Sequence, residues 1–290
     1  MTNCDKKKKK VEPPEVIVVE EWRKWAGLNP EILALIFKKV GPVEEMMKRV
    51  PLVCKGWMEV VAGPYCWSEV DVQGWCRRRS DSNAVDMVVM KLVRRSKCMV
   101  QLLSVYRLGE SGFFFVANCG KFLKELQMPM SVITDQMLSK HIKPLPNLTM
   151  LDVSYCFKIT AKGLAAFGNQ CKSLVHLKRN MPPLDASSPV NDSEAKAIAD
   201  TMPCLEWIEL CFGQFGDSGL SEIITKCNSL AKLDIIGSWN VQLNGDLLEK
   251  CEYLKDFQSP WSNYDNEYCD TDGSDIDMSG FGSESGSESY

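Results

Sequence analysis

The chain has 290 residues, of which 45% are hydrophobic and 25% charged, the composition of an ordinary globular protein with one or two domains. Its net charge of -4 and pI near 5.5 give no reason to expect nucleic acid as a partner, because nucleic-acid-binding domains usually carry a basic face. No apolar stretch is long enough for a signal-peptide core or a membrane span, and Thr2 excludes N-myristoylation. We therefore expect a protein of the nucleus, the cytoplasm or both, whose 13 cysteines are reduced thiols.

Residues 1–21 predict a disordered basic leader. The run Lys6–Lys10 fits a nuclear-import signal or a solvated basic tail, and the composition leaves both open. Residues 262–290 predict a disordered acidic tail, because they are rich in Ser, Gly, Asp and Glu and cannot bury enough apolar surface to offset the entropy of ordering.

Residues 22–70 predict a small module of three helices, over 30–40, 43–49 and 51–61. Asn29 is a suitable cap for the first helix, and Pro30 fits its first position. Three helices over about 40 residues make a very small core, and the first helix is apolar nearly all round. The surplus apolar surface therefore needs a partner, either the rest of the chain or another protein.

Three segments of this module carry a recognisable pattern: Leu28–Phe37 (LNPEILALIF), Val53–Trp57 (VCKGW) and Tyr65–Trp67 (YCW). In this order and spacing they resemble the F-box family over about 45 residues. One departure is that Asn29 separates Leu28 from Pro30, where the family usually has Pro directly after the first Leu. We expect this to alter a contact slightly without loss of function.

The resemblance implies that the module binds a Skp-family adaptor and, through it, cullin and RING subunits. Phe37 and Trp67 are expected in the module's own core, whereas Leu33 and Ile36 are expected at the adaptor interface. Matching by motif position gives the expected adaptor contacts as Leu28, Pro30, Ile32, Leu33, Ile36, Val53, Cys54, Lys55 and Trp57.

Residues 71–97 predict a helical connector, and residues 98–261 predict a solenoid of six to seven repeats. The pattern Leu-x-x-Leu-x-apolar recurs at intervals of 24 to 31 residues, with a weaker earlier copy at Val100. Its first leucines are Leu123, Leu148, Leu174, Leu205, Leu230 and Leu254. A second signal keeps the same phase, because a small residue precedes an apolar one in most helical parts, as in Lys162–Leu164 and Ser218–Leu220.

Cysteines also keep the phase of the repeat. Cys171, Cys227 and Cys251 each stand three residues before the first leucine of a unit. The repeats therefore resemble the cysteine-containing class of leucine-rich repeats, in which each unit is a strand followed by a helix and neighbours close a common core. These cysteines are expected to be small buried hydrophobes, because no Cys-x-x-Cys pair suggests zinc.

One unit departs from the pattern. Arg179 stands where an apolar residue is expected, and residues 181–191 form an insertion rich in Pro and Ser, which we interpret as a surface loop.

Strand alternation places the leucines inward and the intervening residues on the concave face. Those twelve residues include five acidic side chains and two lysines, which predicts a mildly basic target surface. Trp207 is the expected anchor, with packing under the 181–191 loop as the alternative. The candidate target contacts are Glu125, Met150, Asp152, His176, Lys178, Trp207, Glu209, Lys232 and Asp234, and Gln127, Asp256 and Gln258 complete the face.

The expected fold is therefore α/β: a small three-helix F-box followed by a short leucine-rich-repeat solenoid, with parallel strands on the concave face and helices on the convex face. The resemblance implies a non-catalytic substrate-recognition subunit of an SCF ubiquitin ligase that leads a protein target to degradation. The chain has two histidines and no phosphate-binding loop, so no catalytic residue, metal or cofactor is expected. The alternatives are a repeat scaffold without ligase assembly, in which the F-box segment only caps the solenoid, and, last, a hormone sensor.

Overall fold

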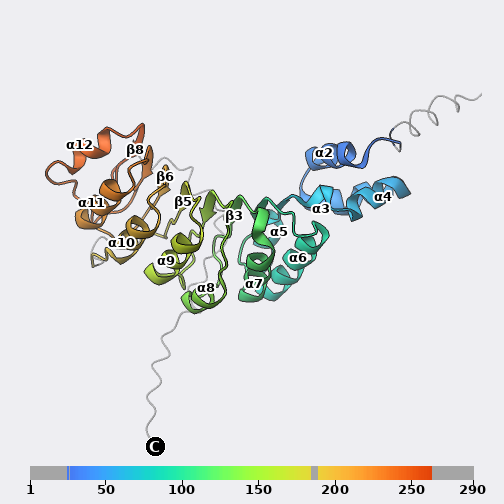
Figure 1. The fold of residues 1–290 in the computed structure, drawn as a ribbon, viewed down its shortest axis with the longest axis horizontal. Coiled ribbons are helices and arrows are strands. Elements are labelled where there is room, and N and C mark those ends of the chain that lie inside the picture. Colours follow the sequence, from blue (N-terminus) through green and yellow to red (C-terminus); the bar gives the residue numbers. More distant parts are fainter. Residues whose placement is uncertain (1–24, 26, 184–188, 263–290) are drawn as a thin grey trace, which may run out of the picture.

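The computed structural model describes residues 25, 27–183 and 189–262, so the predicted leader and nearly all of the predicted acidic tail lie outside the described residues (Figure 1). At the N-terminal end lies a helical module. It consists of α2 (Pro30–Val40), α3 (Val43–Arg49), the 3-10 turn η1 (Val50–Leu52), α4 (Lys55–Ala62) and the 3-10 turn η2 (Tyr65–Trp67).

The ends of α2 follow from its sequence. Asn29 Oδ1 accepts a hydrogen bond from Glu31 N at 2.7 Å, and Pro30 occupies the first position, where no N–H is needed. Gly41 stops the helix with φ +156°. The predicted third helix begins later than expected, because Pro51 lies in η1 and α4 starts at Lys55.

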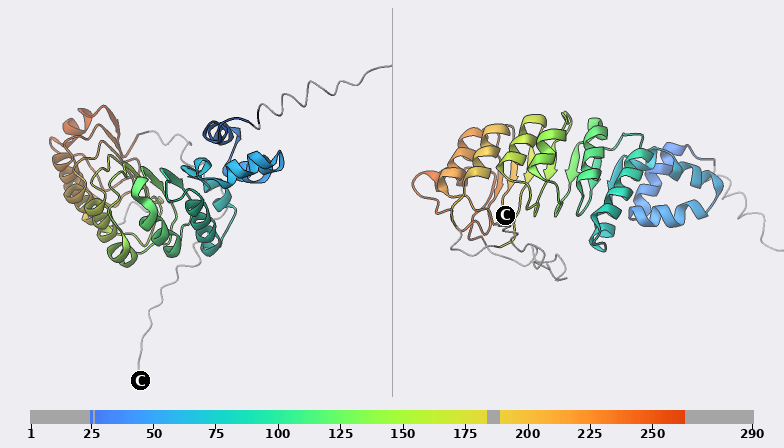
Figure 2. Two further views of the ribbon diagram at one scale, coloured as in Figure 1. Left: turned by 45° about the vertical axis from the view of Figure 1, so that its right-hand side comes forward. Right: turned by 90° about the horizontal axis from the view of Figure 1, so that it is seen from below.

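The rest of the described chain forms one parallel sheet of eight strands, in the order β1 to β8. Each strand has three residues: β1 (Glu69–Asp71), β2 (Leu102–Ser104), β3 (Glu125–Gln127), β4 (Met150–Asp152), β5 (His176–Lys178), β6 (Trp207–Glu209), β7 (Lys232–Asp234) and β8 (Asp256–Gln258). Helical segments connect them: α5 (Gln73–Arg77), α6 (Ser82–Arg95), α7 (Glu110–Cys119), η3 (Gly120–Phe122), α8 (Asp135–His141), α9 (Ala161–Gln170), α10 (Ser193–Thr201), α11 (Asp217–Lys226) and α12 (Leu247–Glu252). Figure 2 shows a curved solenoid in which helices form the outer layer and strands line the inner face. This confirms the predicted fold class.

The predicted start of the solenoid at residue 98 is wrong. Strand β1 pairs with β2 in register Val70 to Leu103, so the supposed connector 71–97 is the helical part of a first repeat. The described sheet therefore has eight strands instead of six or seven. The first unit lacks the leucine pattern because Trp67, Val70 and Val72 are its buried residues, so counting leucines could not detect it.

A column of apolar side chains runs through the centre of every strand. The register aligns them across the sheet as Val70, Leu103, Leu126, Leu151, Leu177, Ile208 and Leu233, each at most 1% exposed, with Phe257 at the end. Cys171, Cys227 and Cys251 are also buried, which confirms their expected role as small hydrophobes.

Carboxylates link successive units in a way that the repeat pattern did not predict. In four places an Asp near the start of one helix accepts hydrogen bonds from the backbone just before the next helix. The pairs are Asp86 with Gly109 N (2.7 Å), Asp135 with Thr160 N (2.9 Å), Asp192 with Gly216 N (2.8 Å), and Asp217 with the N–H groups of Gln242, Leu243 and Asn244 (2.8 to 3.0 Å). The first three links satisfy the N–H group of a helix N-cap residue, and the fourth satisfies three N–H groups of the loop before α12.

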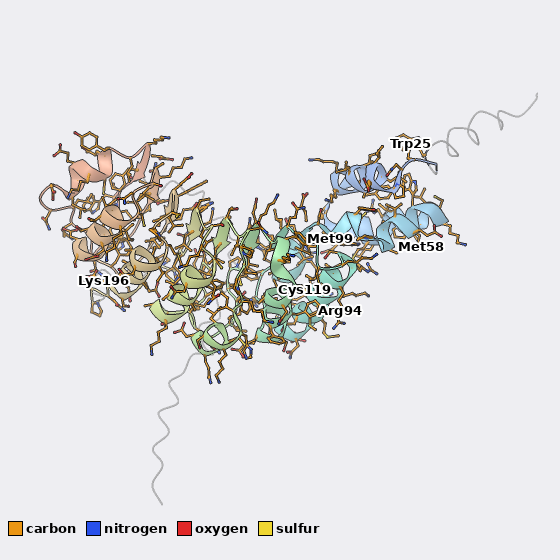
Figure 3. All side chains as sticks on the ribbon, in the orientation of Figure 1. Trp25, Met58, Arg94, Met99, Cys119 and Lys196 are labelled. Carbon is orange, nitrogen blue, oxygen red and sulfur yellow. The ribbon has the colours of Figure 1, made fainter. Side chains whose placement is uncertain are left out.

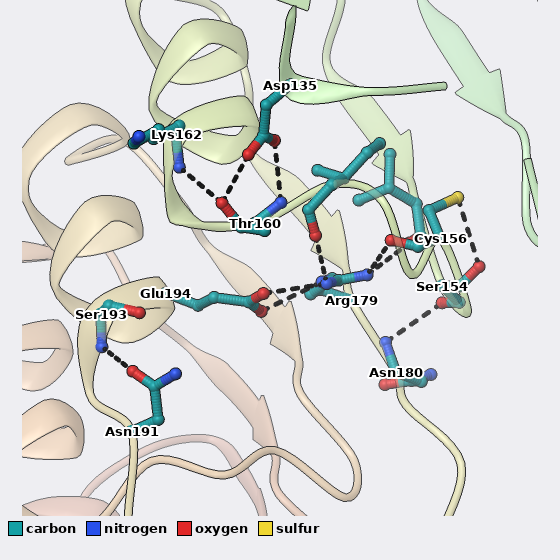
Figure 4. A network of polar contacts seen from close by, with 12 residues as sticks. Asp135, Ser154, Cys156, Thr160, Lys162, Arg179, Asn180, Asn191, Ser193 and Glu194 are labelled. Carbon is teal, nitrogen blue, oxygen red and sulfur yellow. Dashed lines mark hydrogen bonds and ion pairs between the residues drawn. The ribbon is translucent and has the colours of Figure 1, made fainter. Parts of the chain in front are cut away.

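Arg179 explains the departure in its unit. The guanidinium is 2% exposed and donates to the carbonyl oxygens of Val153, Cys156 and Ile159 at 2.7 to 3.3 Å (Figure 4). It also pairs with Glu194, beyond the insertion. One buried cation thus holds the turn after β4 and the far end of the 181–191 segment. Among the described residues, no helix is both long enough and apolar enough to cross a bilayer.

Candidate functional site: an exposed apolar surface on the helical module and a polar concave face

Several large apolar side chains of the helical module face solvent. Ile32 and Leu35 lie three residues apart on α2, on one face of the helix, and are 50% and 63% exposed. Leu52 of η1 is 82% exposed, Val53 is 43% exposed, and Met58 of α4 is 46% exposed. Because exposed apolar groups are unusually dense in so small a module, they indicate a protein-binding surface.

The structure corrects the expectation for Leu33. Its side chain is 2% exposed and belongs to the module's own core, together with Ala34 and Phe37. Ile36 is half-buried and packs against that core. Periodicity allowed either face of α2 to point inward, and the packing of α4 and η2 against the helix selects the face with Leu33. Exposure of both Leu33 and Ile36 in the free chain is the feature expected to separate an F-box from a simple solenoid cap. Leu33 is buried and Ile36 is half-buried, while Ile32 and Leu35 are exposed instead.

The remaining expected adaptor contacts divide by exposure. Pro30 and Lys55 are exposed, whereas Leu28, Cys54 and Trp57 are half-buried. Trp57 packs against Phe37 with ring centroids 4.8 Å apart. Phe37 and Trp67 are 1% and 0% exposed, in agreement with their predicted place in the core. Leu35, Leu52 and Met58 are exposed but were not among the expected adaptor contacts, although the motif positions beside them indicate the same segments.

Ion pairs join the helical module to the first repeat. Lys38 of α2 hydrogen-bonds Ser68 and lies 3.3 Å from Glu69 of β1, and Arg78 after α5 pairs with Glu44 of α3. The side chains of these ion pairs border a cleft of about 690 Å³ between the module and the solenoid. These contacts fix how the module sits on the repeats (Figure 3, where Met58 of α4 and Met99 before β2 mark the two parts).

The concave face consists of two side-chain rows that cross the strands. The register gives one row as Glu69, Leu102, Glu125, Met150, His176, Trp207, Lys232 and Asp256, and the other as Asp71, Ser104, Gln127, Asp152, Lys178, Glu209, Asp234 and Gln258. Their alternation with fully buried leucines agrees with the predicted orientation.

Trp207 stands between neighbours on both sides. The ring of His176 stacks on it with centroids 4.0 Å apart and planes 6° apart, and Lys232 Nζ lies 4.7 Å from the ring centroid. Trp207 remains 37% exposed. The side chain is therefore fixed by adjacent strands and still accessible, which fits the predicted anchor better than the alternative of packing under the 181–191 loop.

Glu209 is the buried centre of the polar row. Its Oε1 lies 3.3 Å from His176 Nε2 and 3.0 Å from Lys178 Nζ, and the residue is 3% exposed. Burial alone would raise the pKa of Glu209, but the hydrogen bond from His176 and the charge of Lys178 outweigh it and hold that pKa below its ordinary value. For Asp152, burial dominates and raises the pKa in spite of hydrogen bonds from Ser154.

These contacts revise the predicted charge of the concave face. Glu209 is paired with His176 and Lys178, and Asp234 is only 8% exposed. Lys232 is exposed and Lys178 partly so. A count of residue types therefore overstates the accessible negative charge beside Trp207, and the mildly basic target that it predicted is not retained.

Within residues 25, 27–183 and 189–262, no group of three or more His, Cys, Asp or Glu side chains is placed to hold a metal ion. Burial raises the pKa of the Cys156 and Cys171 thiols to about 12, which keeps both protonated and unreactive at neutral pH.

Sequence comparison identifies relatives along most of the chain. The chain is 39% identical over 232 residues to the F-box protein FBW2 of Arabidopsis thaliana, and the aligned region covers 79% of this chain and 73% of that protein. It is 29% identical to the F-box protein SKIP19 of the same plant, over 82% of this chain and 78% of that protein. It is also 29% identical to the putative F-box/LRR-repeat protein 23, over 85% of this chain and 56% of that protein. No protein-family model matches the chain.

Proposed function

Because the chain belongs to the F-box family of leucine-rich-repeat proteins, we propose that it is the substrate-recognition subunit of an SCF (Skp–cullin–F-box) ubiquitin ligase. In this role the helical module binds a Skp-family adaptor, which connects it to cullin and RING subunits. The solenoid binds a protein target, and ubiquitin transfer is carried out by the partner subunits, leading to proteasomal degradation. The proposed location is the nucleus, the cytoplasm or both.

The observation that carries the proposal is the exposed apolar surface of the helical module. Burying a side chain such as Ile32, Leu35 or Leu52 against a partner contributes roughly 1.5–3 kcal/mol each. A few such side chains supply most of the energy of a protein interface. Their position on the segments that match the F-box pattern connects this surface to adaptor binding.

The concave face supports the second half of the proposal. Eight strands at about 4.8 Å spacing form a face about 34 Å wide, which suits an extended peptide or one side of a small domain. Trp207 is the proposed anchor, because it is exposed, rigidly held and flanked by the lysines 178 and 232.

Co-purification with a Skp-family adaptor tests the proposal. The wild-type chain should retain the adaptor, and the double variant Leu35→Asp/Leu52→Asp should lose it with an unchanged circular dichroism spectrum. Substitution of Leu33 is unsuitable, because a buried Asp there would unfold the module.

Met87→Asp is the matched control. Met87 is 68% exposed on α6, outside the helical module, so this variant should bind the adaptor like the wild type. If the wild type itself fails to bind, the ligase role is wrong and a protein-binding repeat scaffold becomes the better account.

A further inference from the structure

One edge of the solenoid carries a row of basic side chains. The row lies where the helix of each of the first four repeats ends and the chain turns into the next strand. We call it the basic rim; its members are Arg94, Arg95, Lys97, Lys121, Lys124, Lys140, Lys143 and Lys172. Figure 3 marks its beginning with Arg94 of α6 and the nearby Cys119 at the end of α7. The turn segments 96–101, 120–124, 142–149 and 171–175 contain no Asp or Glu.

The basic rim is not neutralised by the described part of the chain. No member forms an ion pair with another described residue. All are exposed except Arg95, which is half-buried over the ring of Trp67. Favourable interaction with the helix C-termini accounts for Arg94, Arg95 and Lys140, which lie in last turns, and for Lys172, whose Nζ donates to Gly168 O of α9 at 2.9 Å, but not for Lys97, Lys121, Lys124 and Lys143.

The same edge is different in the later repeats. Lys226 lies 2.6 Å from both Asp200 and Glu222, and Lys250 lies 2.6 Å from Asp246. These two cations have partners of opposite sign within the fold, and Lys255, in the turn before β8, stands between Glu252 and Asp256 in sequence. The excess positive charge is therefore confined to the edge along β2 to β5, and it is complementary to an acidic, extended ligand.

An acidic segment of suitable length follows the last strand. Residues 263–290 contain eight Asp or Glu residues and no Lys or Arg. They are attached through Ser262, just beyond β8, which lies three to six strand spacings, or roughly 15–30 Å, from β5 to β2. A flexible chain of 28 residues has an r.m.s. span of about 30 Å. Such a tether gives an effective concentration of about 1 mM, so weak charge pairing suffices.

We propose that residues 263–290 bind in cis along the basic rim, pairing their carboxylates with its lysines and arginines. The interaction is independent of adaptor binding by the helical module. Because these contacts are exposed, they weaken with rising ionic strength. Two other occupants of the basic rim are to be distinguished: the same acidic segment of a second copy of the chain, and an external polyanion such as single-stranded RNA. The leader lysines Lys6–Lys10 are instead a competing site for the same carboxylates.

Carbodiimide coupling of the full-length chain tests the proposal, because it joins carboxylates to lysine amines that are in direct contact. Mass spectrometry should find residues 263–290 coupled to Lys97, Lys121, Lys124, Lys140, Lys143 and Lys172. Coupling should be lost at about 1 M salt, where the Debye length is about 3 Å. With a mixture of isotope-labelled and unlabelled chains, the products should be within single chains.

A charge-reversal pair provides the control. Lys121→Glu/Lys143→Glu should reduce coupling to the remaining lysines of the basic rim several-fold. Lys158→Glu/Lys162→Glu should leave it unchanged, because both lysines are exposed on the opposite edge, Lys158 just before α9 and Lys162 in its first turn.

Three results would overturn the proposal: coupling confined to Lys6–Lys10, coupling mainly between differently labelled chains, or equal loss in both charge-reversal variants. Absence of rim coupling together with rim-dependent binding of single-stranded RNA would also overturn it and assign the basic rim to an external polyanion.

Discussion

Arg179 and Glu194 form a bidentate ion pair across the 181–191 insertion. Arg179 Nη2 lies 2.9 Å from Glu194 Oε1, and Arg179 Nε lies 3.1 Å from Glu194 Oε2. Arg179 is fully enclosed, whereas the Glu194 side chain is 33% exposed. The pair joins two segments that the insertion separates in sequence, and the three carbonyl contacts of Arg179 extend the link to the preceding repeat.

Substitution of Arg179 should therefore be costly. Arg179→Met leaves the Ile159 carbonyl without its donor, removes one of two hydrogen bonds to the Val153 and Cys156 carbonyls, and breaks the ion pair with Glu194, so it should lower the free energy of unfolding by about 3–5 kcal/mol. Glu194→Gln keeps a hydrogen bond and partial access to water, so it should cost less, about 1–3 kcal/mol. Urea denaturation of both variants measures the difference. A loss under about 0.5 kcal/mol for Arg179→Met would show that the network is not structural.

Asp86 gives a pH dependence of defined sign. Burial raises its pKa, in spite of hydrogen bonds from Gly112 N and Gly109 N. The folded protein thus holds this proton more tightly than the unfolded chain does. This contribution to stability increases as the pH falls from about 7 through the raised pKa toward the ordinary Asp range, and it is absent in Asp86→Asn.

The wild type should accordingly gain stability relative to Asp86→Asn in urea denaturation as the pH falls from about 7 toward the ordinary Asp pKa of about 3.9. Carboxylates common to both proteins cancel in this comparison. A relative loss over the same interval would mean that the backbone hydrogen bonds outweigh burial and lower the pKa of Asp86.

Trp207 should matter for target binding more than for folding. Trp207→Ala removes one stacked ring and should cost roughly 0.5–1.5 kcal/mol beyond lost burial. Peptides selected for binding to the wild-type chain should bind this variant at least about tenfold more weakly, which corresponds to about 1.4 kcal/mol. Trp239→Ala, 39% exposed beyond β7, is the control and should bind them normally. Equal binding by all three proteins would remove Trp207 as the anchor.

The later repeats were predictable from sequence because a strand of three residues has only one inward position, and the recurring leucine marks that position in each repeat. Leu126, Leu151 and Leu177 align in adjacent strands as their spacing predicts. The first repeat was missed because Trp67, Val70 and Val72 fill the buried positions of its unit, and none of them is a leucine. Only the pairing of Val70 with Leu103 in the structure reveals this repeat, because the residues between them show no repeat pattern.

The functional surfaces were predicted less well, for physical reasons. An apolar helix such as α2 does not reveal which face its neighbours cover, so Leu33 was assigned outward and Leu35 was missed. On the concave face, residue types predicted an acidic surface, but the bonds of His176 and Lys178 to Glu209 decide which charges remain accessible. The aspartates that link the repeats stand at different distances from the strands in sequence, and only their hydrogen bonds reveal their common role.

Titration calorimetry of the purified chain with a purified Skp-family adaptor tests the central claim most directly. The account predicts a saturable 1:1 interaction with a negative heat-capacity change, the mark of apolar burial. Leu35→Asp should abolish the binding, and Met87→Asp should leave it intact. Absence of binding by the wild-type chain, or undiminished binding by Leu35→Asp, would contradict the assignment of this surface as the adaptor site.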